Sequence, residues 1–488
     1  MYKGVVGFCL WALICWNTSA QTNGFRAEYE AFRQQANDKY EHFRDEANKK
    51  YAEFVRKAWK EYTTMPAIPK PKEEEIPPVT MPIEERENPV EDRPVPIKEE
   101  AVVPPAPEPQ PVPVSPIREE LAPTAQYVSF QLYGTDFRVR FSKEERFTLK
   151  SCKNVAIADA WEKLAGTAYN NTIRDCIEIR IQRQLSDWAY LKLLNKMAEA
   201  CLGKSNEATL LMAFVFCQSG YQMRLGVGND RLYMLYACKH CIYDQSYFKL
   251  NGEQFYTFEC QESHLSICNV KFPNEKPLSL FINNEQLFAN DKSPIRTLVS
   301  EQYRNISVDV SVNKNAIAFY NDYPTSMINN DVMTRWAMYA NASIGKTTKD
   351  TFYPTLRESL KGMNQKEAAE RLLNWVQTAF VYEYDDKVWG GDRAFFPEET
   401  LYYPYCDCED RSILFTRLVR DLLGLKCILI YYPGHLASAV CFTENVTGDY
   451  ININGRKFIV CDPTYIGAPV GRTMPDMDNA TAKVILLE

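Results

Sequence analysis

Residues 403–440 read YPYCDCEDRSILFTRLVRDLLGLKCILIYYPGHLASAV, and this stretch decides the fold of the C-terminal part of the chain. Apolar side chains recur at helical spacing after Cys408 until Gly424 interrupts them, and a strand-like run follows. His435 then opens a second strand, HLASAVCF. The sequence therefore predicts a helix and a strand that each begin with a reactive side chain, 27 residues apart.

A third polar residue belongs to the same arrangement. The strand KFIVCD ends at Asp462, and the Asn454-Gly455 turn before it is typical of a hairpin. The hairpin returns Asp462 towards the start of the preceding strand, where its carboxylate could fix the tautomer of His435. A helix N-terminus and an imidazolium both lower a thiol pKa, so Cys408, His435 and Asp462 are predicted as nucleophile, base and orienting acid.

Other residues near this group have less certain roles. Trp389 lies 19 residues before Cys408 and could wall the site or donate its indole N–H to an oxyanion, or it could only pack. Glu409 and Asp410 fall in the first helical turn, and we expect them to face solvent or to pair with Arg411 or Arg393. We predict no metal ligands and no cofactor.

The segments PEETLYYPYCDCEDRS, PGHLASAV and FIVCDPTY together resemble the transglutaminase-like superfamily, papain-like enzymes with Cys, His and Asp in that order, here of a bacterial secreted type. The resemblance implies acyl transfer or hydrolysis through a cysteine thioester, on peptide or glutamine amides. It also implies that Cys408 rather than Cys406 is the nucleophile, because Ser412 supplies the small residue four positions on. Leu436 and Ala437 depart from the common residues after the histidine. The alternative is a catalytically silent envelope binding or scaffold protein that retains the fold.

A second, earlier segment repeats this pattern. SNEATLLMAFVFCQSGYQMRL resembles CEDRSILFTRLVRDLLGLKCIL. LNGEQFYTFE resembles INGRKFIVCD, which lies 203 residues later in the chain. In the earlier copy Lys204 and Arg231 stand approximately where the later copy has Cys408 and His435. The alignment predicts a duplicated unit whose first copy has lost the chemistry, unless the similarity of two helix–strand–hairpin segments is chance.

The N-terminal part has three different compositions. Residues 1–20 read as a secretory signal peptide, and no later stretch approaches the length of a membrane span. An 11-residue repeat predicts an amphipathic helix over residues 21–62. The apolar stripe of this helix could pack against a second copy of the chain, the body of the protein or the cell envelope. It consists of Tyr29, Tyr40, Tyr51, Phe32, Phe43, Phe54, Ala36, Ala47 and Ala58. Residues 63–124 hold 17 of the 28 prolines among many glutamates and are predicted to be a disordered linker.

The remaining chain completes an α+β prediction. We expect a degenerate transglutaminase-like domain over 125–268, a β-rich connecting region over 269–364 and a transglutaminase-like catalytic domain over 365–488. The net charge of −7 without a basic stripe argues against nucleic acid, so the expected partner is a peptide or protein substrate, in the periplasm or cell envelope of a bacterium.

Cysteine usage leaves several outcomes open. Removal of the signal leaves 13 of the 15 cysteines, an odd number, so at least one thiol should be free or paired between molecules. The pair in CKHC, Cys238 and Cys241, could form a structural disulfide, a thiol pair or part of a metal site.

Overall fold

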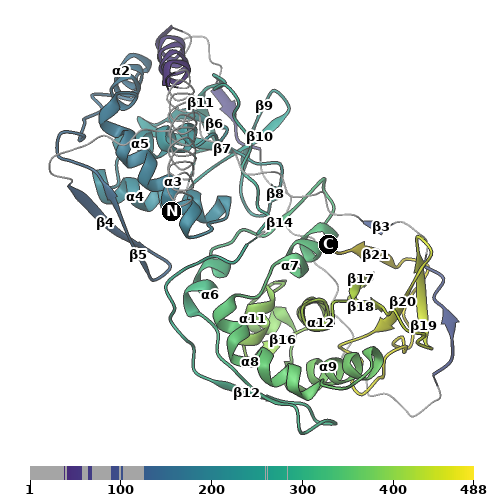
Figure 1. Cartoon of the computed structure of the whole chain (residues 1–488). Helices are drawn as coiled ribbons and strands as arrows, with labels where there is room; N and C mark the ends of the chain where they lie inside the picture. Colours follow the sequence, from purple (N-terminus) through teal and green to yellow (C-terminus); the bar gives the residue numbers. More distant parts are fainter. Residues whose placement is uncertain are drawn as a thin grey trace, which may run out of the picture.

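The computed structural model describes residues 38, 41–57, 64–68, 90–97, 101–102 and 126–488, without 259, 261 and 283. The predicted signal peptide and most of the repeats and the linker lie outside these residues. Two lobes are visible in Figure 1, one blue to teal and one green to yellow. Mixed helices and sheets in both lobes agree with the α+β prediction.

The N-terminal lobe packs helices against a six-stranded sheet with the order β1-β11-β6-β7-β10-β9. Its helices are α2 (Asn154–Leu164), α3 (Asn170–Gln182, after the 3-10 turn Thr167–Tyr169), α4 (Asp187–Leu202) and α5 (Asn206–Gln218). The sheet contains β1 (Thr64–Pro66), β6 (Met223–Gly228), β7 (Arg231–Ala237), β9 (Tyr247–Leu250), β10 (Glu253–Thr257) and β11 (His264–Cys268). A separate hairpin, β4 (Tyr127–Leu132) and β5 (Thr135–Arg140), turns at Gly134.

The C-terminal lobe surrounds a seven-stranded sheet with the order β2-β19-β20-β18-β17-β21-β3. Its strands are β2 (Arg93–Pro94), β3 (Ala101–Val102), β17 (Lys426–Tyr432), β18 (His435–Cys441), β19 (Asp449–Ile453), β20 (Arg456–Cys461) and β21 (Lys483–Leu486). The helices are α9 (Gln365–Ala379), α10 (Asp385–Val388), α11 (Pro397–Tyr402) and α12 (Cys408–Leu423). A short parallel pair, β15 (Val381–Tyr382) with β16 (Tyr405–Cys406), precedes α12.

The two sheets share one strand order, but one edge strand differs in direction, because β1 is antiparallel to β11 whereas β3 is parallel to β21. From β1 to β9 the first sheet runs β1-β11-β6-β7-β10-β9, and the second, from β3, runs β3-β21-β17-β18-β20-β19 with β2 added at the end. Helix α5 packs on β7 as α12 packs on β18. The repeat found in the sequence is therefore matched by equivalent helices and strands in equivalent positions.

The connecting region differs from the β-rich prediction. Between residues 269 and 364 the structure has only short strands, β12 (Arg296–Val299), β13 (Ser307–Val310) and β14 (Ser326–Met327, paired with β8, Cys241–Ile242). The region contains more helix than strand, in α6 (Lys314–Asn321), α7 (Met333–Asn341) and α8 (Lys346–Ser359). The sequence ISVDVSVNKNAIAFY (residues 306–320) alternates like two strands around an Asn-Lys-Asn turn. In the structure, Asn313 instead accepts a hydrogen bond from the Asn315 N–H and caps α6.

The N-terminal helix, described over residues 41–57, lies against the body of the protein. Asn48 and Gln218 of α5 exchange side-chain hydrogen bonds, and Asn48 Oδ1 also accepts from Trp161 Nε1 at 3.0 Å. Tyr51 packs on Trp161, with ring centroids 4.4 Å apart. The buried face differs from the predicted stripe, however, because Phe43 and Phe54 are 38% and 45% exposed.

The described pieces of the predicted linker are ordered strands rather than spacer. Strand β1 pairs with β11 of the first sheet, whereas β2 and β3 pair with the edge strands β19 and β21 of the second. Arg93 of β2 also forms an ion pair with Asp449 at 2.9 Å. These additions satisfy the open backbone groups of edge strands, so in these pieces the prediction of disorder is wrong.

The structure also bears on membrane spans and on the pairing of the cysteines. Of the described helices, none is long and apolar enough to cross a lipid bilayer. None of the 13 cysteines from Cys152 onward, Cys238 and Cys241 included, forms a disulfide with another described residue.

Candidate functional site: a buried Cys-His-Asp group

Helix α12 begins where the sequence predicts and places Cys408 at its first turn. Asp407 precedes the helix, and its backbone N–H donates to Asp410 Oδ2 at 3.3 Å. Gly424 ends the helix in the left-handed conformation, with φ of 67°. The apolar side chains between these ends are buried, so the helix start is fixed against the sheet.

The backbone N–H and the carbonyl of a single residue, Leu436, join this helix to β18. The Leu436 N–H donates to Cys408 Sγ at 3.4 Å, and the Leu436 carbonyl accepts from Ser412 Oγ at 2.7 Å. Ser412 lies one helical turn after Cys408, so its small side chain lets the helix approach the strand closely. The thiol consequently lies next to the first residues of β18.

His435 and Asp462 meet through the strand register. Ser438 of β18 lies opposite Cys461 of β20, so the next residue, Asp462, is a diagonal neighbour of His435 on the same face. His435 Nε2 and Asp462 Oδ2 are 2.8 Å apart, and both side chains are buried. His435 Nδ1 is buried and has no hydrogen-bond partner among the described residues. The structure thus brings all three predicted residues into one region.

Gln377 of α9 holds the Asp462 loop, and sequence reasoning did not identify it. Its side-chain N–H groups donate to the carbonyl oxygens of Asp462, Tyr465 and Ala468, at 2.7 to 3.1 Å. Asp462 Oδ1 meanwhile accepts from Thr464 N at 2.9 Å. A buried glutamine in an amphipathic helix is the only sequence signal for this function, and it is not specific.

The acids around Cys408 are buried, contrary to expectation. Glu409 is 4% exposed and accepts a hydrogen bond from the Cys408 thiol at 3.3 Å. Asp410 is fully buried and accepts from Phe395 N at 2.8 Å. Arg411 donates instead to backbone carbonyls of α9 and of the residue after it. The expected solvent exposure and pairing with Arg411 are therefore wrong, because the loop before α11 covers the helix start.

This burial changes the acid–base chemistry of the thiol. Burial, followed by the charges of Glu409 and Asp407, raises the pKa of Cys408 well above its ordinary value, and the Leu436 N–H opposes this only in part. Burial and neighbouring carboxyls also raise the pKa of Asp407 and of Asp410 well above the usual range. The expected lowering of the Cys408 pKa is therefore wrong for this conformation, in which the thiol is neutral.

Acid groups also offer oxygen ligands to a cation. Ligand atoms of Asp385, Asp392 and Glu409 lie within 4.8 Å of one another, as do those of Asp407, Cys408 and Glu409. Arg335 already neutralises Asp392, with Nη2 to Oδ2 at 2.6 Å. Burial, followed by the charge of Glu409, raises the pKa of Asp385 to about 8. A carboxyl that holds its proton at neutral pH is a weak metal ligand, so these groups alone do not define a metal site.

Trp389 lies apart from the thiol. It packs against Phe395 and Tyr403 and carries the Arg393 guanidinium over its ring at 4.6 Å. It lines a cavity of about 520 Å³ that Asp392 also lines. None of the described contacts joins Trp389 to Cys408, so packing and wall formation are what the geometry supports.

Tyr382 is a further residue that the sequence did not single out. It pairs with Cys406 in β15 and β16, next to the start of α12, and its hydroxyl is buried without a hydrogen-bond partner among the described residues. Burial raises the pKa of its hydroxyl. A neutral hydroxyl near the thiol is a donor available to a developing oxyanion.

Known proteins do not decide the function of this group of residues. Comparisons of the chain with models of protein families, with curated proteins and with solved structures give no match. The geometry itself supplies the Cys408 thiol at a helix start and an imidazole, His435, whose Nε2 is held by Asp462. His435 Nδ1 has no hydrogen-bond partner among the described residues, and the Tyr382 hydroxyl is a nearby donor.

Proposed function

We propose that the C-terminal lobe catalyses acyl transfer through Cys408, as the transglutaminase-like resemblance implies, on amides of peptides or of glutamine side chains. One observation carries the proposal. Asp462 Oδ2 lies 2.8 Å from His435 Nε2, and the buried Nδ1 of His435 has no hydrogen-bond partner among the described residues. At the same end of β18, the Leu436 N–H donates to Cys408 Sγ. This is the arrangement that a base needs in order to accept a thiol proton.

The reaction follows from these groups. His435 Nδ1 takes the thiol proton as Cys408 Sγ attacks the amide carbonyl, and the Cys408 N–H and the Tyr382 hydroxyl are placed to donate to the oxyanion. The intermediate collapses to a thioester, and the leaving amine takes the proton from His435. Water or a second amine then attacks the thioester and releases the thiol. Because Cys408 is a neutral thiol, proton transfer accompanies attack rather than preceding it.

The closed state of the site favours a second candidate, a scaffold without turnover. Cys408 is 1% exposed and its thiol bonds to Glu409. For catalysis, substrate must displace this contact or the loop before α11 must move. A silent protein would need neither.

Labelling and turnover of the full chain separate the two candidates. Peptide amides and glutamine peptides with a primary amine are screened against wild type and Cys408→Ala, and any product is identified by mass spectrometry. The catalytic proposal expects turnover that Cys408→Ala abolishes, together with a trapped acyl adduct on Cys408. If no substrate gives turnover and an electrophilic acyl donor never labels Cys408, the scaffold reading replaces it.

A further inference from the structure

The first copy has a cavity at the position where the second copy has its thiol and imidazole. Arg231 opens β7 as His435 opens β18, and Lys204 lies two residues before α5. A shared bond makes Asn206, the first residue of α5, the counterpart of Cys408, because Leu232 N donates to Asn206 Oδ1 at 2.9 Å as Leu436 N donates to Cys408 Sγ. In the second copy Cys408 and His435 are buried, whereas in the first the equivalent space is a cavity of about 510 Å³.

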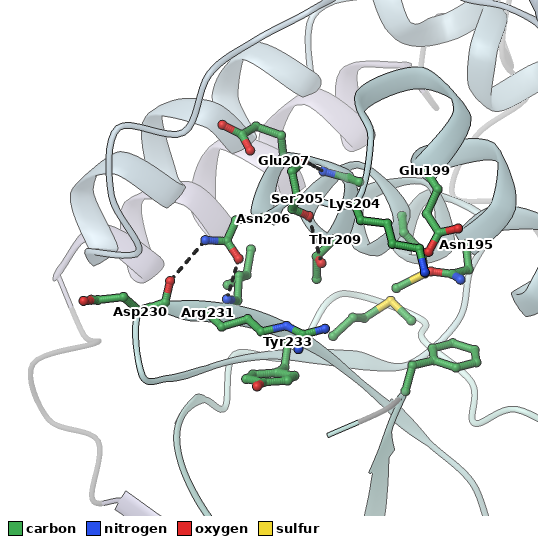
Figure 2. Close-up of a pocket in the computed structure, with 15 residues that line it drawn as sticks. Asn195, Glu199, Lys204, Ser205, Asn206, Glu207, Thr209, Asp230, Arg231 and Tyr233 are labelled. Carbon is green, nitrogen blue, oxygen red and sulfur yellow. Dashed lines mark hydrogen bonds between the residues drawn. The ribbon is translucent and has the colours of Figure 1, made fainter. Parts of the chain in front are cut away.

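The walls of this cavity come from three elements, shown in Figure 2. Asn195 and Glu199 of α4 and the first turns of α5 line one side, and the start of β7 lines the other. Apolar side chains complete the lining, contributed by Met212, Met234 and Phe258. Asn206 ties α5 to β7 by bonds to Leu232 N and to the Asp230 carbonyl, so the opening has a fixed width.

Two exposed cations, Lys204 and Arg231, lie at the opening beside three acids, Glu199, Glu207 and Asp230. Lys204 and Arg231 are exposed, and neither forms an ion pair or hydrogen bond with any described residue; Arg231 lies over the Tyr233 ring at 5.2 Å. The nearby acids are engaged or directed elsewhere. Glu207 accepts from Leu149 N at 2.7 Å, Glu199 pairs with Lys196 at 3.6 Å, and the Asp230 carboxylate points away from the cavity in Figure 2.

We propose that this cavity binds an extended acidic peptide, with a carboxylate between Lys204 and Arg231 and an apolar side chain against Met212, Met234 and Phe258. A volume of about 510 Å³ matches a ligand of several residues and greatly exceeds a single inorganic anion. Carboxylates favour arginine because its planar donors match both oxygens. The first copy thus keeps the cleft of the repeated fold and uses it for recognition; this inference does not depend on the chemistry proposed for Cys408.

Binding of a defined probe tests the proposal. The probe is a fluorescein-labelled peptide of sequence Ala-Leu-Glu-Phe-Glu-Ala, with a matched peptide in which glutamine replaces both glutamates, and anisotropy is measured with the full chain. We expect saturable binding that weakens with added salt, and about tenfold or greater loss of affinity for the glutamine peptide and for the double variant Lys204→Gln, Arg231→Gln. Lys271→Gln, which removes an exposed cation of the same lobe outside the cavity, should bind like wild type.

Two further variants make the outcome specific. Cys408→Ala should bind the probe like wild type, so failure of the catalytic proposal leaves this result unchanged. The acidic run Glu73–Glu75 of the chain itself is a rival source of the ligand, and if it occupies the cavity, changing all three to glutamine should tighten probe binding. Equal affinity of wild type and the Lys204, Arg231 double variant, or no saturable probe binding even in the triple glutamine variant, would overturn the proposal.

Discussion

At the scale of single residues, the orientation of His435 depends on Asp462. In Asp462→Asn, the amide oxygen can keep the bond from Thr464 N, which turns the amide NH₂ towards His435 Nε2. The ring must then carry its proton on Nδ1, the nitrogen proposed to accept the thiol proton. A comparable change in a serine triad lowers turnover about 10⁴-fold, and we expect a loss of that order. Turnover on a substrate from the screen is compared with the thermal unfolding midpoint; unchanged turnover would contradict the assigned role.

Glu409 sets the reactivity of Cys408 in the closed site. Glu409→Gln keeps an acceptor for the thiol but removes the negative charge that helps to raise the pKa of Cys408. The midpoint of the pH profile for alkylation of Cys408 should therefore fall towards the ordinary thiol value of about 8.5, and labelling at pH 8 should accelerate severalfold. Glu358→Gln, which changes an exposed acid on α8, should leave the profile in place. A profile identical to wild type in Glu409→Gln would show that Glu409 does not raise the pKa of Cys408 and that burial and Asp407 set it.

The three site residues were predictable because chain order and local geometry determine their positions. The helix start fixes Cys408, the strand start fixes His435, and the hairpin at Asn454-Gly455 fixes the register that returns Asp462. The environment was not predictable in the same way. Whether Glu409 faces water or the interior depends on the loop before α11, which covers the start of α12. No local sequence pattern predicts that contact.

At the scale of elements, the docking of the N-terminal helix rests on a buried amide pair. Asn48→Ala removes the partner of the Gln218 side chain and of Trp161 Nε1 together. Each unsatisfied buried group costs about 1–3 kcal/mol, so we expect a loss of about 2–4 kcal/mol and faster proteolysis within residues 41–57. Phe43→Ser should have little effect, because Phe43 lies on the exposed side. Equal stability of the two variants by denaturant unfolding would argue against docking through Asn48.

The helix also shows where a periodic pattern is ambiguous. Tyr51 and Ala47 of the predicted stripe are buried, but so are Arg44 and Asn48, which a hydrophobicity pattern assigns to solvent. Their partners, Asn170 and Gln218, belong to α3 and α5. Over the described residues 41–57 the period predicted a helix correctly, whereas the buried face was set by hydrogen bonds to distant elements. The β1, β2 and β3 strands were missed for a similar reason, because their order comes from the sheet edges and not from their own composition.

At the scale of the whole molecule, duplication explains how one sheet plan serves two different surfaces. Both copies join the helix start to the second strand through the N–H of a leucine, Leu232 or Leu436. In the second copy that contact secures a buried thiol, and in the first it secures the rim of an open cavity with two exposed cations, Lys204 and Arg231. The lobes are connected by the sequence between them and also by the early strands, which reach both sheets. The first copy has Asn206 and Arg231 where the second has Cys408 and His435, and it keeps the same strand order.

The buried acids also give the stability of the whole chain a pH dependence. Burial, followed by the charge of Glu409, raises the pKa of Asp385 to about 8, compared with about 3.9 for an ordinary aspartate. The folded state therefore binds this proton more tightly than the unfolded state. The resulting stabilisation is complete below about pH 4 and is lost as pH rises through about 8. Wild type should accordingly lose stability between pH 5 and 9.

Replacing this acid tests that dependence directly. Asp385→Asn can still accept the bond from Arg393 N through its amide oxygen, and its NH₂ can donate to the neighbouring carboxylates without any proton to lose. The variant should therefore gain on wild type steadily from pH 5 to pH 9, by an amount on the order of several kcal/mol at most. Asp386→Asn, at the exposed neighbour on α10, is the matched control and should follow wild type. Denaturant unfolding at several pH values measures the difference. A constant gap between Asp385→Asn and wild type at every pH would mean that Asp385 is already ionised in the folded protein, with Arg335 then left to balance Asp385, Asp392 and Glu409 together.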